Sequence, residues 1–340
     1  MIVHSQRLVW FTARLAWALR HTCNPPYLCC LTDGLPVEQD FKDLFATLIV
    51  SLLPLSAHRV RLTKVEHTFL SEDAINNLGS LKFSQSNRGP DPRDPERIVT
   101  TTTTTTFSMT RDMAKSMAQH FMDARLIENA AEPSANLFKD RGVYQITPKG
   151  LHVLERFISR NGMDAETLLP VFQSQPICMK LLHLERRQSD DEIIVSQSVI
   201  TALFRRFVGR QPNMMQEKTQ YTDPNVYYAD RAKGMPLFEF GERTQASGGR
   251  GTPQPYQYCF SAVAALEWLC DFTSVVGRDE AAEMSAHFVR FGLIALAHDK
   301  RKGNDSAIIF TVRGTPGQNI AVGVLFPLWS NVIHETYRFV

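Results

Sequence analysis

Apolar residues recur with helical spacing in two stretches of the chain that are copies of each other. The stretches 111–130 and 278–297 share the pattern R-D-x-A-x-x-M-x-x-H-F-x-x-x-x-L-I-x-x-A, with nine identities in twenty positions and no gap. The shared alanine, methionine and phenylalanine stand at i, i+3 and i+7, so they fall on one face of an amphipathic helix. An internal repeat fixes the architecture of a chain. The sequence therefore predicts one unit, a helix that leads into a β-hairpin, present twice.

The shared apolar positions, together with one tryptophan, form the predicted core of the two copies. Residues on the apolar face of an amphipathic helix pack inward, and the leucine–isoleucine pair after each helix opens the hairpin. The predicted core residues are Ala114, Met117, Phe121, Leu126, Ile127, Ala281, Met284, Phe288, Leu293, Ile294 and Trp268. His120 and His287 stand beside the core phenylalanines, but the repeat supplies no partners for a metal or acid–base role. We therefore interpret both histidines as structural.

The pattern before the first copy predicts three further elements. A helix begins at Asp40, which is a candidate N-cap residue, and ends at Pro54. From His58 onward basic and apolar residues alternate, which is typical of a half-buried strand or arm. A short capped helix follows at Ser71, and its counterpart in the second copy begins at Ser261. Each copy is therefore expected to contain more than the repeated helix alone.

Polar and low-complexity segments set the predicted boundaries. The first copy carries an insertion with seven threonines, Thr100–Thr106, which we interpret as a solvated loop, with a phosphorylatable switch as the alternative. Residues 1–32 lack Asp and Glu, which fits a poorly structured extension or a targeting segment. The predicted order is an extension over 1–39, a first unit over 40–160 with the insertion at about 79–107, a helical connecting segment over 161–209, a flexible linker over 210–257, a second unit over 258–314 and a tail without assigned fold over 315–340.

Composition and charge exclude several classes of protein. A net charge of +2 over 340 residues gives no bulk electrostatic attraction to nucleic acid. No apolar run approaches the roughly 18 residues that span a bilayer. The six cysteines form no C-x-x-C pair, which is typical of reduced thiols rather than of a zinc site. The chain also lacks the P-loop, G-x-S-x-G and H-E-x-x-H motifs. We therefore predict no catalytic residues, no metal and no cofactor.

The second copy carries residues that resemble a DEP domain. A Trp-Leu pair ends the segment 265–269, an Arg-Asp-Glu-Ala helix begins at 278, Gly-Leu-Ile follows at 292–294, and an aromatic strand closes the unit at 305–310. The resemblance implies a compact winged helix with a β-hairpin arm between its first two helices. It implies an α+β, mainly helical chain, in which two winged-helix domains are joined by a helical segment and a flexible linker.

The tandem arrangement, the threonine insertion and the segment 184–193 resemble more narrowly the fungal developmental regulators of G-protein signalling, the FlbA type. The resemblance implies an intracellular, cytoplasmic protein, peripheral at the plasma membrane, that inhibits heterotrimeric G-protein signalling during fungal development. Members of that family continue into an RGS domain, which positions the catalytic groups of Gα. No such domain is recognised in 315–340, so Gα is an indirect partner and we expect no GTPase acceleration. The alternatives are a GTPase-activating protein whose RGS domain is missing from this chain, and a protein-interaction scaffold without lipid contact.

Basic residues at the tips of two hairpins are the candidate contacts. A receptor tail or anionic lipid headgroups are the predicted partners, because cationic side chains adhere to such surfaces. The candidates are Lys300, Arg301 and Lys302 on the second wing and Arg59, Arg61 and Lys64 on the first arm. An ordinary solvated turn is the alternative interpretation. A winged helix also raises the question of DNA binding, but 279–289 carries three acidic residues and no Lys or Arg. That face repels phosphate, so we predict no nucleic-acid partner.

Overall fold

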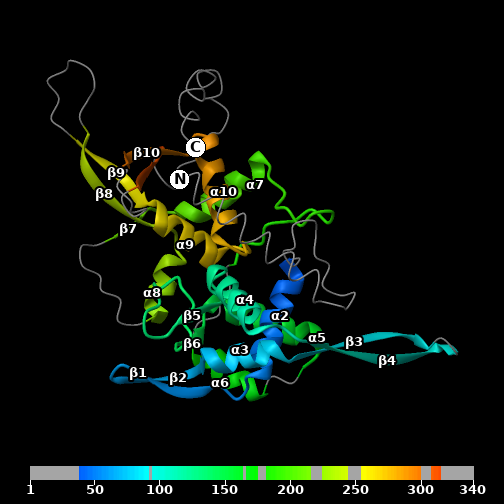
Figure 1. The fold of residues 1–340 in the computed structure, drawn as a ribbon. Coiled ribbons are helices and arrows are strands. Elements are labelled where there is room, and N and C mark those ends of the chain that lie inside the picture. Colours follow the sequence, from blue (N-terminus) through cyan, green and yellow to red (C-terminus); the bar gives the residue numbers. More distant parts are fainter. Residues whose placement is uncertain are drawn as a thin grey trace.

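The buried apolar side chains of the protein form two separate clusters. The computed structural model describes residues 38–91, 94–163, 166–174, 181–215, 224–243, 254–299 and 308–314. Within them one cluster is drawn from the stretch 41–171 and the other from 184–312. Each cluster is the core of one unit that contains both helices and strands (Figure 1).

The first unit packs its helices against a four-stranded sheet. In chain order it contains α2 (Glu38–Ser51), β1 (Ser56–Val60), β2 (Thr63–Leu70), α3 (Ser71–Gly79), β3 (Leu81–Asp91), β4 (Asp94–Phe107), α4 (Arg111–Asp123), β5 (Ile127–Asn129), β6 (Val143–Ile146), α5 (Pro148–Asn161), the 3-10 helix η1 (Glu166–Leu168) and α6 (Leu169–Ser174). The sheet order is β1-β2-β6-β5. The rings of Phe41 and Phe45 on α2 lie 5.2 and 5.5 Å from Phe121 on α4, so the repeated phenylalanine lies where these helices meet.

The second unit has the same plan with a larger sheet. In chain order it contains α7 (Gln197–Val208), β7 (Asn213–Met214), α8 (Pro224–Arg231), β8 (Pro236–Arg243), β9 (Gln254–Ser261), α9 (Ala262–Phe272), α10 (Arg278–Arg290), β10 (Ile294–Asp299) and β11 (Ile308–Val312). The sheet order is β10-β11-β9-β8-β7. On α7 the rings of Phe204 and Phe207 lie 5.0 and 5.4 Å from Phe288, the counterpart of Phe121.

The two units share one succession of elements, which is that of a winged helix. A first helix, a hairpin arm, two further helices and a wing hairpin follow one another in both. These are α2, β1–β2, α3, α4 and β5–β6 in the first unit, and α7, β8–β9, α9, α10 and β10–β11 in the second. The predicted α+β fold with two winged helices is therefore confirmed. Every predicted core residue, from Ala114 to Ile294, is at most 4% exposed.

The segment expected to be a flexible linker contains ordered elements instead. Within 210–257 the structure has β7, α8 and β8 in full and the start of β9. Tyr228, Met235 and Leu237 are buried in the second core. The helix α7, which the sequence places in the connecting segment, lies in that core as well. A composition rich in Gly, Pro and Gln concealed these few apolar positions. We therefore propose that the second unit begins at Gln197.

The insertion in the first unit is a β-ribbon, so the expectation of a loop is wrong over the described residues. Strands β3 and β4 pair antiparallel from Leu81 opposite Phe107 to Pro90 opposite Ile98. The threonine run 100–106 lies opposite residues 82–88. Polar composition indicated a loop, but β-branched threonine favours extended backbone. Figure 1 shows this ribbon extending away from the helices on the side opposite to β1–β2.

Two predicted helix starts differ from the structure. Asp40 lies in the first turn of α2 rather than before it, and α2 ends at Ser51, ahead of Pro54. Ser71 does not cap α3: its hydroxyl donates to the carbonyl of Asp140 at 2.6 Å and accepts from a backbone N–H of the wing. In the second unit Ser261 does cap α9, because its hydroxyl accepts from the N–H of Ala264. The first-unit serine therefore ties a helix to the wing instead of closing the helix.

The repeated helices end in the same left-handed turn, with different residues at its centre. After α4 the φ angle of Arg125 is 57°, and after α10 that of Gly292 is 66°. In both copies the next N–H donates back to the core phenylalanine carbonyl at 2.9 Å, as in a Schellman motif. Glycine adopts this conformation without strain, whereas a residue with a Cβ is strained by roughly 1 kcal/mol. The first unit therefore places a strained arginine where the second has glycine.

Candidate functional site

The β1–β2 hairpin, which carries three of the predicted contact residues, ends in an exposed turn. Strand pairing reaches Val60 and Thr63, so Arg61 and Leu62 form a two-residue turn. The φ angle of Arg61 is 54°, and tight hairpin turns require such a left-handed first residue. The side chain of Leu62 is 89% exposed. The tip therefore presents a leucine to solvent directly after an exposed arginine.

The charges at this tip are mostly positive and unneutralised. Arg59 and Arg61 are exposed, and among the described residues neither has a carboxylate within ion-pair distance. Lys64 lies 2.8 Å from Glu66, but both side chains are more than half exposed. Such a pair contributes little, because water screens it. Three cations and one carboxylate beside an exposed leucine suit an anionic surface.

The base of the same hairpin is fixed by a buried threonine. Thr68 has no exposed surface, and its hydroxyl lies 2.8 Å from Nδ1 of His58. The Thr68 hydroxyl also donates to the backbone carbonyl of Ser56 at 3.1 Å. These contacts hold both strands at the point where the hairpin leaves the core. The direction of the arm is therefore set by the first unit.

The second predicted basic group, Lys300, Arg301 and Lys302, lies outside the described residues. Its flanking strands are described: β10 and β11 pair as far as Asp299 opposite Ile308. These strands lie at the upper end of the molecule in Figure 1, whereas β1–β2 lies at the lower end. The structure therefore does not bring the arm and the strands of the second wing together into one surface.

A group of buried charged side chains joins the two units, and we call it the inter-unit seam. Its members are Arg125, Glu128, Lys149, Tyr228, Arg231 and Asp271. Nε of Arg125 donates to Oδ1 of Asp271 at 2.8 Å, and Arg231 donates to the other oxygen of that carboxylate. The side chains of Arg231 and Asp271 are 5% and 2% exposed. One carboxylate of α9 thus receives an arginine from each unit.

A tyrosine and an acidic residue complete the hydrogen bonds of the seam. The hydroxyl of Tyr228 donates to Glu128 at 3.0 Å and accepts from Arg125 at 3.2 Å. The other oxygen of Glu128 accepts from Gln145 at 2.7 Å. The guanidinium of Arg231 lies 4.9 Å from the centre of the Tyr227 ring. The carboxylates of Glu128 and Asp271 balance the two arginines, and this part of the seam is hydrogen-bonded throughout, whereas the amine of Lys149 is held by backbone carbonyls alone.

Burial and ion pairing have opposite effects on the pKa values of the charged seam residues. Burial alone would raise the pKa of Asp271, but the guanidinium groups of Arg125 and Arg231 outweigh it and hold that pKa below its ordinary value. Burial lowers the pKa of Lys149 to about 8. The Lys149 amine donates to the carbonyls of Cys270 and Val275, both at 2.7 Å. An amine from α5 thereby holds the loop between α9 and α10.

A second clamp lies on the segment between the units. Arg186 donates to both carboxylate oxygens of Glu280 on α10, each at 2.8 Å. The same guanidinium lies 3.5 Å from Glu38 on α2. A bidentate arginine–carboxylate pair fixes direction as well as distance. The connecting segment therefore holds helices of both units.

This arrangement of elements agrees with the comparisons to known proteins. Residues 40–174 match the fungal-differentiation regulator winged helix domain family. That match runs from α2 to α6 and includes the β3–β4 ribbon.

Two relatives extend the match beyond the first unit. The chain is 41% identical over 285 residues to the developmental regulator flbA of Emericella nidulans, which covers 84% of this chain and 39% of flbA. It is 28% identical over 179 residues to the regulator of G-protein signaling 1 of Schizosaccharomyces pombe, covering 52% of this chain and 36% of that protein. The chain thus spans less than two fifths of the length of either relative. The predicted resemblance to FlbA-type regulators is confirmed.

Both repeat histidines, His120 and His287, are half-buried. Burial lowers the pKa of His120, although Asp123 and Asp279 oppose that shift. Nδ1 of His287 is buried without a hydrogen-bond partner in the part of the chain that the structure describes. Within those described residues no three metal-ligating side chains converge. In the same part of the chain no helix has both the length and the hydropathy for a bilayer crossing.

The seam residues were not found from the sequence. Arg125 and Asp271 are 146 residues apart, so no local pattern connects them. One signal was present: Arg125 occupies the repeat position at which the second copy has Gly292. A residue with a side chain at a position that favours glycine is strained, and strain often marks a function.

Proposed function

We propose that the chain is a non-enzymatic module that brings a regulator of heterotrimeric G-protein signalling to an anionic membrane or to a receptor tail. The observation that carries the proposal is the tip of β1–β2. There Leu62 is 89% exposed and follows two exposed arginines without carboxylate partners among the described residues. In this proposal the winged helices of this chain serve attachment, and the regulated reaction takes place on another domain or protein.

The relatives support the signalling role. One is a developmental regulator and the other a regulator of G-protein signaling. We infer that this chain acts as a negative regulator of G-protein signalling in fungal development. Contact with Gα would be indirect, through an RGS domain, because we predict no GTPase-activating surface on either winged helix.

The strength of the arm contact follows from its chemistry. Each basic residue near an anionic leaflet contributes about 1 kcal/mol before salt screens it. Arg59, Arg61 and Lys64 therefore give weak, reversible adhesion, which burial of Leu62 in the interface strengthens. A second contact on the same chain increases the overall affinity, because the first contact holds it at a high local concentration near the membrane. The basic residues 300–302 of the second wing are the predicted second contact.

A protein-interaction scaffold without lipid contact is the second candidate. Its support is the β3–β4 ribbon, which forms a two-stranded sheet of its own. The outer edges of such a ribbon carry backbone groups that an extended segment of a partner can pair with. In this case binding would be to a peptide and independent of anionic lipid.

Vesicle co-sedimentation separates these two functions. The full chain is mixed with phosphatidylcholine vesicles with and without phosphatidylserine, and the double variant Arg59→Glu/Arg61→Glu is compared with the unchanged protein. We expect the variant to lose most of its binding to anionic vesicles. Arg141→Glu/Arg210→Glu is the matched control, because it changes the net charge equally at exposed arginines elsewhere. Equal binding of all three proteins would reject the lipid contact and favour the scaffold.

The wing is tested in the same assay by Lys300→Glu/Arg301→Glu/Lys302→Glu. A further loss of binding is expected when this triple variant is combined with the arm variant. If the triple variant binds as the unchanged protein does, the wing is a solvated turn. A receptor-tail peptide is then titrated against the same variants, and loss of peptide binding in the arm variant alone would identify the tail as the partner.

A further inference from the structure

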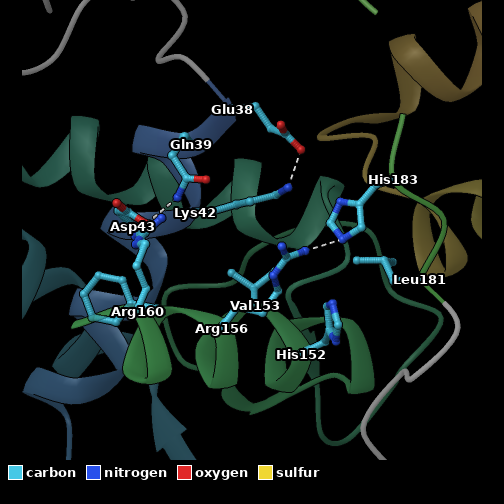
Figure 2. A pocket seen from close by; sticks show the side chains of 11 residues that line it. Glu38, Gln39, Lys42, Asp43, His152, Val153, Arg156, Arg160, Leu181 and His183 are labelled. Atoms are coloured by element: carbon cyan, nitrogen blue, oxygen red, sulfur yellow. Dashed lines mark hydrogen bonds and ion pairs between the residues drawn. The ribbon is translucent and has the colours of Figure 1, made fainter. Parts of the chain in front are cut away.

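A cavity of about 350 Å³ lies between α2, α5 and the segment that leads to the second unit. We call it the α2–α5 cavity. Its polar lining residues are Glu38, Gln39, Lys42, Asp43, His152, Arg156, Arg160 and His183. On α5 the residues His152, Arg156 and Arg160 follow at intervals of four, so one face of that helix lines the cavity. Figure 2 shows these side chains directed toward α2 and His183.

The ion pairs of the cavity leave one arginine without a carboxylate. Lys42 pairs with Glu38, and Arg160 pairs with Asp43. Arg156 instead donates to Nε2 of His183, and no carboxylate among the described residues lies within ion-pair distance of it. Each carboxylate of the cavity wall is thus taken by another cation. The guanidinium of Arg156 keeps a positive charge that a ligand can neutralise.

His152 adds an unused hydrogen-bonding group to the same wall. Both of its ring nitrogens are buried, and neither has a hydrogen-bond partner among the described residues. A buried polar atom without a partner is costly. The ring lies 6.1 Å from that of His183, on the Arg156 side of the cavity. Burial, with Arg156 second, lowers the pKa of both histidines and so favours the neutral ring, and a neutral imidazole has one N–H to donate.

We propose that the α2–α5 cavity binds a small soluble phosphate monoester, held by Arg156 and by a ring N–H of His152. The planar fork of a guanidinium matches two phosphate oxygens, and such charge-assisted bonds are the strong ones. A dianion neutralises the unpaired cation and supplies the partner that His152 lacks. The cavity has the size of ordinary small-molecule sites.

The position of the cavity favours a soluble ligand over a lipid headgroup. The helices α2 and α5 lie on the side from which β3–β4 extends, whereas the β1–β2 tip points the other way (Figure 1). A membrane that touches the arm tip therefore does not face this cavity. Binding at the cavity and adhesion at the arm are accordingly independent, and either can fail without the other.

Calorimetric titration of the full chain with inorganic phosphate and with glycerol 3-phosphate tests the proposal. We expect both to bind, and Arg156→Gln to weaken binding about tenfold or more, as loss of a charge-assisted hydrogen bond predicts. The matched control is Arg141→Gln, which removes an exposed arginine outside the cavity lining, with an expected change within about twofold. Arg156→Lys keeps the positive charge but not the planar guanidinium, so its phosphate affinity should lie between those of Arg156→Gln and the control.

Proton NMR of His152 gives a second, independent measurement. A bound dianion favours the imidazolium, so phosphate should raise the His152 pKa in the unchanged protein and not in Arg156→Gln. The charged groups that face His152 are Arg156, Glu155 and Lys42, with His183 as the neighbouring ring. Thermal melting confirms that each variant is folded before it is titrated.

Three outcomes would overturn the proposal. The unchanged protein shows no binding at millimolar phosphate; or Arg156→Gln binds as tightly as the unchanged protein; or only vesicles that contain a phosphoinositide, or only a phosphopeptide, bind at this cavity. In the last case the ligand is a lipid or a protein and not a soluble monoester. None of these results depends on the arm residues, so they leave the vesicle experiment unaffected.

Discussion

Nε of Arg125 lies 2.8 Å from Oδ1 of Asp271, and this contact joins the turn after α4 to the last turn of α9. The two residues belong to different winged helices. Because Arg231 occupies the other oxygen of Asp271, the carboxylate is shared between the units. The tandem is therefore held by buried charges as well as by apolar contacts.

Removal of this carboxylate should destabilise the protein strongly. Asp271→Asn leaves Arg231 buried without its counter-charge and Arg125 with Glu128 alone, which we expect to lower the free energy of unfolding by about 3 to 5 kcal/mol. Urea denaturation followed by circular dichroism measures the change. The control is Asp190→Asn, since that side chain is 37% exposed in its pair with Arg187. It should change stability far less than Asp271→Asn does; equal effects of the two variants would contradict the role assigned to the seam.

Lys149 predicts a dependence of stability on pH. Its pKa in the folded protein is about 8, below the ordinary value of 10.5, so above pH 8 the unfolded chain binds more protons than the folded one. The free energy of unfolding therefore rises with pH between about 8 and 10.5. Below pH 8 the cost of burying the charged Lys149 amine, about 3 kcal/mol, is fully present. We compare the protein with Lys149→Met between pH 7 and 9. The difference in unfolding free energy should shift in favour of lysine as pH rises; a constant difference would show that the amine is not desolvated.

Gly292 offers a test of backbone strain alone. Its φ angle is 66°, and an added Cβ would meet no atom within 4 Å. Gly292→Ala should therefore lower the unfolding free energy by about 1 kcal/mol through the left-handed conformation only. Gly277→Ala is the control, because that glycine also has open space around it but does not have a left-handed φ. If Gly277→Ala lowers the unfolding free energy as much as Gly292→Ala does, the effect does not come from the left-handed φ angle.

The chain itself should not accelerate GTP hydrolysis. In a single-turnover assay we add it to GTP-loaded Gα of the same source and expect the rate of Gα alone. RGS catalysis depends on holding the switch regions of Gα, and we predict no such surface on a winged helix. A known GTPase-activating RGS domain serves as the positive control. A rate increase by this chain would contradict the proposal of a non-enzymatic module.

The helices of the repeat could be predicted because their signal is local. Apolar residues at i, i+3 and i+7 specify which face is buried whatever the helix packs against. The structure accordingly has α4 beginning at Arg111 and α10 at Arg278, the first residues of the two copies. The sequence did not predict the β3–β4 ribbon. Polar threonines indicate a loop, but their β-branched side chains favour an extended backbone.

The partners of α7 and the members of the seam could not be predicted in this way. The helix itself has a clear apolar face, but nothing local indicates that Phe204 and Phe207 meet Phe288. Buried charges such as Arg231 and Lys149 look like surface residues in a sequence. Their burial depends on partners that only the tertiary structure brings near.

The left-handed turns after α4 and α10 make the tandem directional. At this turn the first unit extends Arg125 into its neighbour, whereas the second has Gly292, which has no side chain to extend. The first unit thus supplies the donor, Arg125, and the second unit supplies the acceptor, Asp271. The second unit has no equivalent donor of its own at Gly292. A further winged helix placed after it would have to dock through different chemistry, so this mode of stacking cannot propagate into an array.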